Sequence, residues 1–106
     1  MSALLHVLIE AQARRTPHRP AVRARGVELS YHELNARANR YAHYMRELGV
    51  GPDAVVGVLM ERCLEMEVAV LAILKAGGAY LPIDTDYPDQ RLERMLGDAS
   101  LALLLT

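Results

Sequence analysis

Two acidic side chains that could hold a metal ion or accept a phosphoryl group, Asp84 and Asp86, lie close together in the sequence. They follow a short apolar run, residues 79–83, that has the pattern of a strand. In an open parallel sheet, ligands gather at the carboxyl ends of the strands, so the pair would lie at the ligand-facing edge. Turn formation and helix capping explain two aspartates equally well. We therefore assign the pair to a turn and predict no metal-binding residue.

A glycine pair at residues 77–78 resembles a phosphate-binding loop at first sight. It follows a helical pattern and precedes a strand pattern, so it belongs to the edge of the sheet opposite to the ligands. The segment after the first buried strand pattern, residues 60–63, is Met-Glu-Arg-Cys and contains no glycine-rich motif. The glycine pair is therefore predicted to end a helix and to permit close packing. We predict no cofactor-binding residue.

The other reactive side chains form no catalytic pattern. Cys63 lies at a strand-to-helix junction, where its thiol could be activated, but no histidine is near it in the sequence. Lys75 lies in the last turn of a predicted helix, where a cation suits the helix dipole. Arginines are frequent in residues 14–25, which we interpret as a solvated face. The histidines lack ligand spacing and are predicted to face solvent: His6, His18, His32 and His43. No catalytic residue is predicted.

The composition excludes several classes of protein. The chain has 106 residues, of which 52% are hydrophobic and 24% are charged, and its net charge is −1. This composition excludes a disordered chain and provides no basic field for nucleic acid. The apolar runs are shorter than the ~20 residues of a membrane span, and the amino terminus has no secretory pattern. The single cysteine excludes an intrachain disulfide and favours a cytoplasmic location.

The first half of the chain predicts two helices and a hairpin. Residues 3–15 form a helical pattern that gathers its apolar side chains on one face, together with a glutamine: Leu5, Leu8, Ile9 and Gln12. Residues 20–24 and 27–29 alternate around a glycine and predict a β-hairpin. Ser30 and Glu33 have the spacing of a capping box. The helix that follows should end near Gly49 and bury Leu34, Ala38, Tyr41, Ala42, Met45 and Leu48.

The second half predicts a strand–helix–strand–helix–strand unit. The strand patterns cover residues 54–60, 79–83 and 101–105. One helix is predicted at 64–76. The other should begin with Pro88 at its first position, with an inner face of Leu92, Met95, Leu96 and Ala99. Two right-handed crossovers follow from this order, which predicts an α/β fold with a parallel sheet.

Two segments carry a family resemblance. Residues 29–34, Leu-Ser-Tyr-His-Glu-Leu, resemble the first core motif of the adenylation domains of nonribosomal peptide synthetases, which belong to the adenylate-forming, AMP-binding superfamily. Residues 74–84, Leu-Lys-Ala-Gly-Gly-Ala-Tyr-Leu-Pro-Ile-Asp, resemble the second core motif almost letter for letter. Tyr87-Pro88 and Arg91-Leu92 match its continuation. The resemblance covers nearly the whole chain, and Leu81 and Thr85 are conservative departures from it.

The resemblance implies a parent enzyme that condenses an amino acid with ATP to give aminoacyl-AMP and pyrophosphate. The acyl group then passes to the phosphopantetheine thiol of a carrier protein. In the family, the phosphate loop, the ribose-binding acid and the catalytic lysine follow the strand that corresponds to residues 101–105. The resemblance therefore implies that residues 1–106 are a non-catalytic amino-terminal fragment of the large subdomain, ending before the phosphate loop. ATP, magnesium and phosphopantetheine would serve the parent, and no cofactor is expected for this chain alone. The resemblance also implies that the residues that line the amino-acid pocket come later in the family than the segment matched by residues 1–106.

The predicted helix at 64–76 also bears on the partners of the chain. Residues 68–74 are apolar on all sides, and three short strands cannot cover such a helix. The last predicted strand has an open edge. We therefore expect the chain to self-associate, to exchange elements, or to require the remainder of its domain.

Two other functions remain as alternatives. One is a stand-alone docking module derived from the same domain. The other is a receiver-like domain with Asp84 as phosphoacceptor, which would need an acidic cluster where Glu61 stands alone.

Overall fold

Three parallel strands form the sheet of the carboxyl-terminal half. The computed structural model describes residues 2–61, 63–98 and 101–106. The sheet has the order β4-β3-β5, formed by β3 (Val55–Val58), β4 (Ala79–Pro82) and β5 (Leu103–Leu105). Val56 of the central strand pairs in register with Tyr80 on one side and with Leu103 on the other. The predicted α/β class with a parallel sheet is confirmed.

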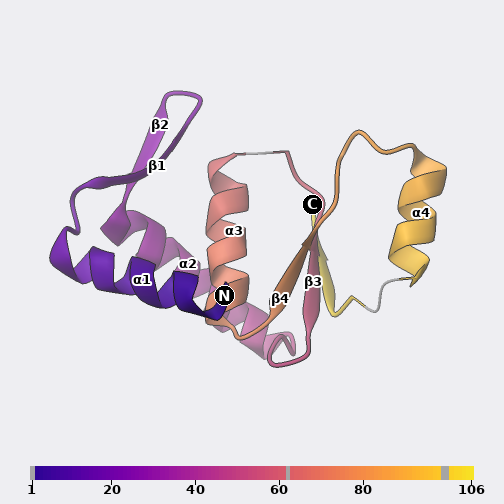
Figure 1. Ribbon diagram of the computed structural model, residues 1–106, viewed down its shortest axis with the longest axis horizontal. Helices are drawn as coiled ribbons and strands as arrows, with labels where there is room; N and C mark the ends of the chain where they lie inside the picture. Colours follow the sequence, from indigo (N-terminus) through magenta and orange to yellow (C-terminus); the bar gives the residue numbers. More distant parts are fainter. Residues whose placement is uncertain (1, 62, 99–100) are drawn as a thin grey trace.

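Helices lie on both faces of this sheet. Figure 1 shows α3 (Leu64–Lys75) on one side of the strands and α4 (Asp89–Asp98) on the other. The chain passes from β3 to β4 through α3, then returns across β3 to reach β5 through α4. Because the two crossovers run in opposite directions along the sheet, a common handedness requires their helices to cover opposite faces. The result is a doubly wound arrangement.

Close packing explains the composition of the central strand. Val56 and Val58 are fully buried, and Gly57 is buried between them. A Cβ atom at Gly57 would lie 2.8 Å from Leu101 Cδ1 and 3.0 Å from Leu104 Cδ1. The strand therefore uses glycine so that leucines around β5 can reach across it. The predicted strand at 54–60 is correct in place but longer than the observed Val55–Val58.

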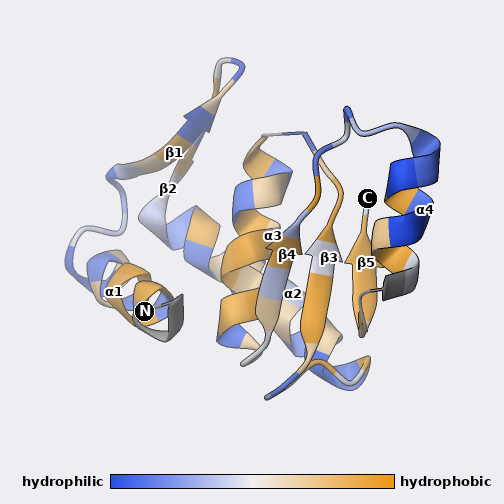
Figure 2. Cartoon of the chain, turned by 45° about the vertical axis from the view of Figure 1, so that its right-hand side comes forward, coloured by the Kyte–Doolittle hydropathy of each residue, from blue (hydrophilic) through white to orange (hydrophobic). Residues whose placement is uncertain are grey.

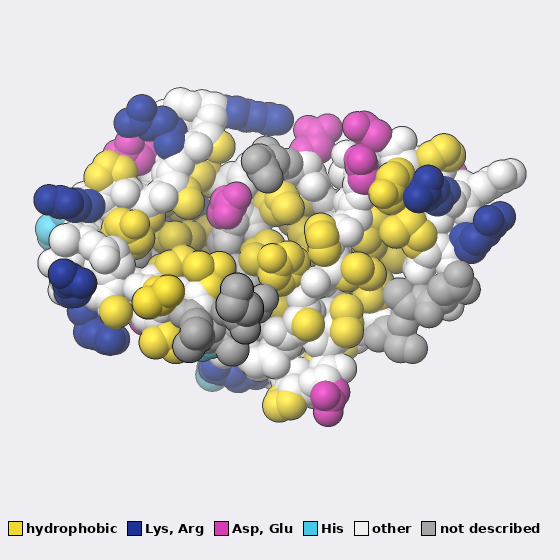
Figure 3. Space-filling model, viewed as in Figure 1, with side chains coloured by type: hydrophobic (Ala, Val, Ile, Leu, Met, Phe, Trp, Pro, Cys, Tyr) yellow, Lys and Arg dark blue, Asp and Glu magenta, His cyan; other side chains and the backbone are white. Residues whose placement is uncertain are grey.

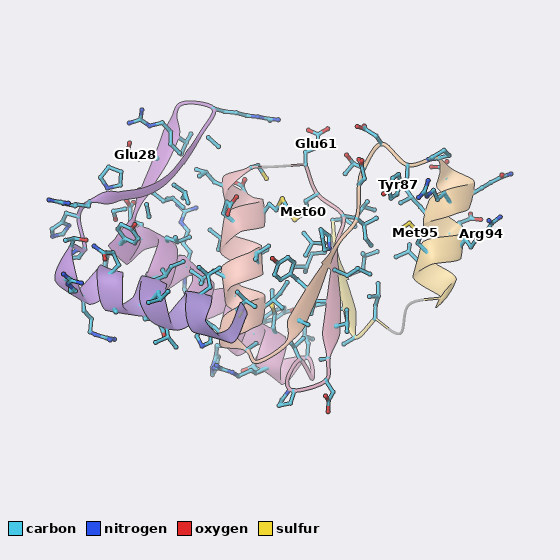
Figure 4. The ribbon with its side chains drawn as sticks, in the orientation of Figure 1. Glu28, Met60, Glu61, Tyr87, Arg94 and Met95 are labelled. Atoms are coloured by element: carbon cyan, nitrogen blue, oxygen red, sulfur yellow. The ribbon has the colours of Figure 1, made fainter. Side chains whose placement is uncertain are left out.

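The amino-terminal half consists of α1 (Ser2–Arg15), a hairpin of β1 (Pro20–Ala24) and β2 (Val27–Ser30), and α2 (Tyr31–Glu47). Arg25 and Gly26 form the hairpin turn with φ angles of 52° and 78°, the backbone of a type I′ turn. Beyond the turn, Arg23 and Glu28 form an ion pair across the strands, with the Glu28 side chain labelled in Figure 4. The predicted hairpin is therefore confirmed.

The predicted capping box starts α2. Ser30 Oγ accepts the N–H of Glu33 at 3.1 Å, and Glu33 Oε1 accepts the N–H of Ser30 at 3.0 Å. The backbone hydrogen bond from Ser30 lowers the pKa of Glu33 below its ordinary value. Such caps stabilise a helix by ~1 kcal/mol. At the other end, Gly49 takes a φ of 97°, the left-handed conformation that favours glycine.

The hydrophobic core lies between α2 and α3 and extends to the sheet. In Figure 2, α3 and strands β3 and β5 are coloured mostly hydrophobic. Ala38 of α2 and Ala72 and Ile73 of α3 have no exposed surface. Small side chains at 38 and 72 let the helices approach closely, while Ile73 fills space near the sheet. A continuous cluster results, and α2 covers the side of α3 that the sheet leaves open, so the expectation of an exposed apolar helix at 64–76 is wrong.

Part of the predicted α2 face is wrong. Leu34, Ala38, Ala42 and Met45 are buried as predicted, but Tyr41 is 47% exposed and Leu48 is 49% exposed. The reason is geometric: the stripe at 34, 38, 42 and 45 meets α3, while Tyr41 and Leu48 lie beside that contact. Helical periodicity identifies the apolar face of a helix. It does not say how much of that face a neighbouring element will bury.

The other helices also differ from their predicted details. In α1, Ile9 packs against the core, whereas Leu5 is 45% exposed and Leu8 is 66% exposed. Helix α4 begins at Asp89, and the carbonyl of Pro88 accepts the N–H of Leu92 at 3.0 Å. Pro88 therefore caps this helix instead of occupying its first position. The inner-face residue Ala99 lies outside the described residues. None of the described helices combines the length and hydrophobicity needed to cross a membrane.

Candidate functional site

The carboxyl ends of the three parallel strands form one edge of the sheet. Glu61 follows β3, Asp84 and Asp86 follow β4, and Thr106 follows β5. Asp84 Oδ1 accepts the N–H of Asp86 at 2.8 Å, and both aspartates are exposed. This contact is the side-chain-to-backbone bond of an aspartate turn. The aspartates therefore lie at the ligand-facing edge as predicted, and the turn assignment is confirmed.

The described side chains at this edge form no metal-binding cluster. Within residues 2–61, 63–98 and 101–106, no three His, Cys, Asp or Glu side chains gather in a metal-binding group. In Figure 4, the Met60 side chain points towards α3, and the Glu61 carboxylate lies in the loop above the sheet. Glu61 forms an exposed ion pair with Arg25 at 3.5 Å. Exposed carboxylates at 61, 84 and 86 give this edge a local negative charge, which repels a phosphate that carries no metal ion.

Tyr87 and Arg91, which match the continuation of the second core motif, have a structural role in this chain. The Arg91 guanidinium lies over the Tyr87 ring, 4.4 Å from its centroid, which is cation–π geometry. This contact ties the loop before α4 to the first turns of the helix. Figure 4 shows Met95 on the side of α4 that faces the sheet and Arg94 on the opposite side. Helix α4 is thus amphipathic, as its sequence predicts.

The predicted roles of Gly77, Gly78 and Cys63 can be compared with their positions. Gly77 has a φ of 89° after α3, so the predicted helix end is confirmed. A Cβ atom at Gly78 would lie 3.0 Å from Val50 Cγ1 and 3.2 Å from the Ala54 carbonyl oxygen, which confirms close packing. Cys63 precedes α3 as its cap residue, is half-buried, and makes no side-chain capping bond.

The histidines do not converge. His18, His32 and His43 are exposed as predicted, and His43 Nε2 lies 3.4 Å from Glu47 Oε1. The prediction for His6 is wrong: it is half-buried, and its Nδ1 has no hydrogen-bond partner among the described residues. This difference arises because α1 turns His6 towards the carboxyl-terminal end of α3.

An apolar hollow lies between α2 and β5. We define it by its lining residues: Tyr41, Tyr44, Met45, Leu48, Met60, Glu65, Ala69 and residues 103–106. Tyr44 is 61% exposed, and Tyr41 and Leu48 are about half exposed. Figure 3 shows that hydrophobic side chains also gather across the middle of the molecule's face, over α3 and the sheet. The sequence signal for the hollow is the spacing of residues 41, 44 and 48, which places three large apolar groups on one side of α2.

Lys75 is the main feature that sequence reasoning missed. Its side chain is 3% exposed, and its Nζ lies 2.6 Å from Glu10 Oε2. The guanidinium of Arg46 donates to the Lys75 carbonyl oxygen. Lysine in the last helical turn predicts only a favourable dipole interaction. The ion pair spans 65 residues of sequence, so no local pattern could have predicted it.

The doubly wound unit, with its hairpin and paired helices, defines an α/β fold. The chain belongs to the AMP-binding enzyme family, whose model matches residues 9–106. That match confirms the superfamily to which the two motifs point.

Relatives and solved structures specify the branch of the family. The chain is 52% identical to bacitracin synthase 3 of Bacillus licheniformis over 101 residues, which are 95% of the chain and 2% of that protein. It is 42% identical to gramicidin S synthase 1 of Brevibacillus brevis over 102 residues, which are 96% of the chain and 9% of that protein. The chain therefore spans a small part of the length of these relatives.

The fold matches solved nonribosomal peptide synthetases. FmoA3 bound to alpha-methyl-L-serine-AMP superposes with a TM-score of 0.90 and 48% identity, covering 95% of this chain and 12% of that one. The AMPPNP-bound form gives a TM-score of 0.89 and 47% identity over 94% of this chain and 11% of that one. The chain is thus similar in sequence and in fold to a segment of an adenylating synthetase.

Proposed function

We propose that this chain is a non-catalytic supporting part of an amino-acid-adenylating domain in nonribosomal peptide synthesis, located in the cytoplasm. The parent reaction joins an amino acid to ATP, releases pyrophosphate, and transfers the acyl group to a carrier-protein thiol. One contrast carries the proposal. The fold superposes on nucleotide-bound synthetases, yet the described carboxyl edge presents exposed carboxylates, with Asp84 and Asp86 forming a turn.

The residues of the chain support such a domain through packing. Val56 and Val58 fix the central strand, and Gly57 lets Leu101, just before β5, and Leu104 within it pack across that strand. The α2–α3 pair then holds one face of this sheet in place. A rigid scaffold of this kind is what positions catalytic groups that are supplied from elsewhere. ATP and magnesium belong to the parent reaction, and we propose no cofactor for this chain alone.

Replacing the matched segment of gramicidin S synthase 1 with this chain tests the proposal. We expect the chimera to retain amino-acid-dependent ATP–pyrophosphate exchange, because a scaffold segment with 42% identity supplies the same fold. In the same chimera, Asp84→Asn and Asp86→Asn should change the exchange rate by less than about threefold, since an asparagine side-chain oxygen at position 84 would still accept the turn hydrogen bond. A loss of about 100-fold or more from either change would show a catalytic acid and would contradict the proposal.

We also propose that the apolar hollow and the open edge of β5 pair with the remainder of such a domain. Tyr41, Tyr44 and Leu48, each 47% exposed or more, lie beside β5, which pairs on one side only within the part of the chain that the structure describes. Exposed apolar surface of this kind marks an interaction site, and a free strand edge invites pairing.

Alone, the chain should therefore self-associate. Size-exclusion chromatography with light scattering should give a mass above that of the 11.8 kDa monomer. The double change Tyr44→Glu and Leu48→Glu should shift the distribution towards monomer, whereas Tyr80→Glu, outside the hollow, should not. A compact monomer at high concentration would contradict self-association. It would favour the stand-alone docking module, whose direct sign is co-purification with an intact synthetase.

A further inference from the structure

Lys75 carries a charge inside the protein. It is the buried charged residue among those that the structure describes, with 7% of its surface exposed. An ammonium group without a partner is costly to bury, and breaking a buried pair destabilises a protein far more than breaking a surface pair. Its partner, Glu10, belongs to α1, and about a third of that side chain is exposed. The position of α1 is therefore coupled to the charge on α3.

Helix α1 packs against α2 and α3, and few of the apolar side chains among residues 5–15 are buried. Ala13 is buried and Ile9 packs against the core. By contrast, Leu5, Val7 and Leu8 are each 45% exposed or more. Figure 1 shows α1 alongside α2, at the outer side of the amino-terminal half. The Glu10–Lys75 ion pair adds a charged contact between α1 and α3 to these apolar contacts.

Groups from three helices surround the pair. On α1 itself, His6 and Arg14 flank Glu10 and act on it through charge. From α3 comes Lys75, and from α2 the Arg46 guanidinium donates to the Lys75 carbonyl oxygen. The hydrogen bond from Lys75 is the main reason why the pKa of Glu10 is below its ordinary value, and burial opposes it. The pair thus joins α1 to a point where α2 and α3 are already tied together.

We propose that Glu10 and Lys75 form a latch that docks α1, and that opening the latch releases α1 while α2, α3 and the sheet stay folded. The folded-state pKa of Glu10 is depressed, so its contribution is complete above the ordinary value of 4.5. That contribution is lost as the pH falls through the lower folded-state value. Acid should therefore free α1 before it unfolds the core.

Hydrogen exchange on the full chain, followed by mass spectrometry, tests the latch. At pH 7, Glu10→Gln should lower the protection of α1 amides by about tenfold or more, because it leaves the buried ammonium without a counter-charge. Protection in α3 should change much less. The matched control is Glu28→Gln, which removes the exposed ion pair with Arg23 and should leave α1 unchanged.

A double variant and a pH series separate release of α1 from general misfolding of the Glu10→Gln variant. Glu10→Met with Lys75→Met replaces the pair by apolar groups of similar length, so α1 should dock again and lose its acid sensitivity. In the unmodified chain, α1 protection, corrected for intrinsic exchange, should fall below pH 4.5 ahead of α3. Equal loss in α1 and α3, or full protection of α1 in Glu10→Gln, would overturn the proposal. These outcomes concern α1 alone, so they do not depend on the role of the chain in adenylation.

Discussion

Replacing Ile73 with alanine is expected to lower the free energy of unfolding by about 2–5 kcal/mol. Ile73 has no exposed surface, and its Cγ2 lies 3.5 Å from the position that a Cβ atom at Gly78 would take. The side chain thus fills the space between α3 and the start of β4. Its loss leaves a cavity that rigid elements cannot close.

Urea denaturation followed by helical circular dichroism measures this effect. Protein concentration should be fixed, because association makes the midpoint depend on concentration. Leu8→Ala is the control: Leu8 is 66% exposed, so the change should stay within about 0.5 kcal/mol. Similar losses for both variants would show that the core does not lie between α2, α3 and the sheet.

Gly57→Val is expected to destabilise the chain by about 1–3 kcal/mol or more, through overpacking. Even the first added carbon meets Leu101 and Leu104 at 2.8 and 3.0 Å, and Ile83 Cδ1 is at 3.4 Å. Valine suits strands in general, so a propensity argument predicts the opposite sign.

The matched control is another glycine. Gly97 lies in α4 with nothing within 4 Å of its would-be Cβ, so Gly97→Ala should stabilise the helix by about 0.5–1 kcal/mol. Denaturation under the conditions used for Ile73→Ala compares the two. A neutral or stabilising Gly57→Val would mean that the sheet does not have the observed order.

Local signals predicted the elements of the fold well. The Ser30–Glu33 capping box and the helix-ending Gly49 and Gly77 depend on hydrogen bonds and backbone angles within a few residues. Because these interactions are local, the sequence contains all the information needed to recognise them. The same is true of the aspartate turn at 84–86.

Long-range contacts explain what the sequence could not predict. Tyr41 and Leu48 lie on the apolar side of α2, but the contact with α3 decides how much of that side is buried. The Glu10–Lys75 pair depends on two helices meeting across 65 positions. The candidate site follows the same rule: the sequence placed Asp84 and Asp86 at the correct edge, whereas the apolar hollow required the packed structure.

The exposed surfaces of the chain agree with a supporting role. The hollow beside β5 and the outer face of α1 leave large apolar side chains in solvent, while α2 and α3 enclose a cluster of buried residues. A unit that has a buried core and also exposes apolar surface suits a scaffold to which further elements attach.

The amino-acid preference of the gramicidin S synthase 1 chimera tests the central claim most directly. ATP–pyrophosphate exchange would be measured with each of the common amino acids, for the chimera and for the unmodified synthetase. If this chain is a non-catalytic support, the chimera should prefer the same amino acids, in the same order, as the unmodified synthetase. Its exchange rate should vary only with the fraction of the chimera that is folded. A chimera that is stably folded but prefers a different amino acid would show that residues 1–106 help select the substrate, and would contradict the account.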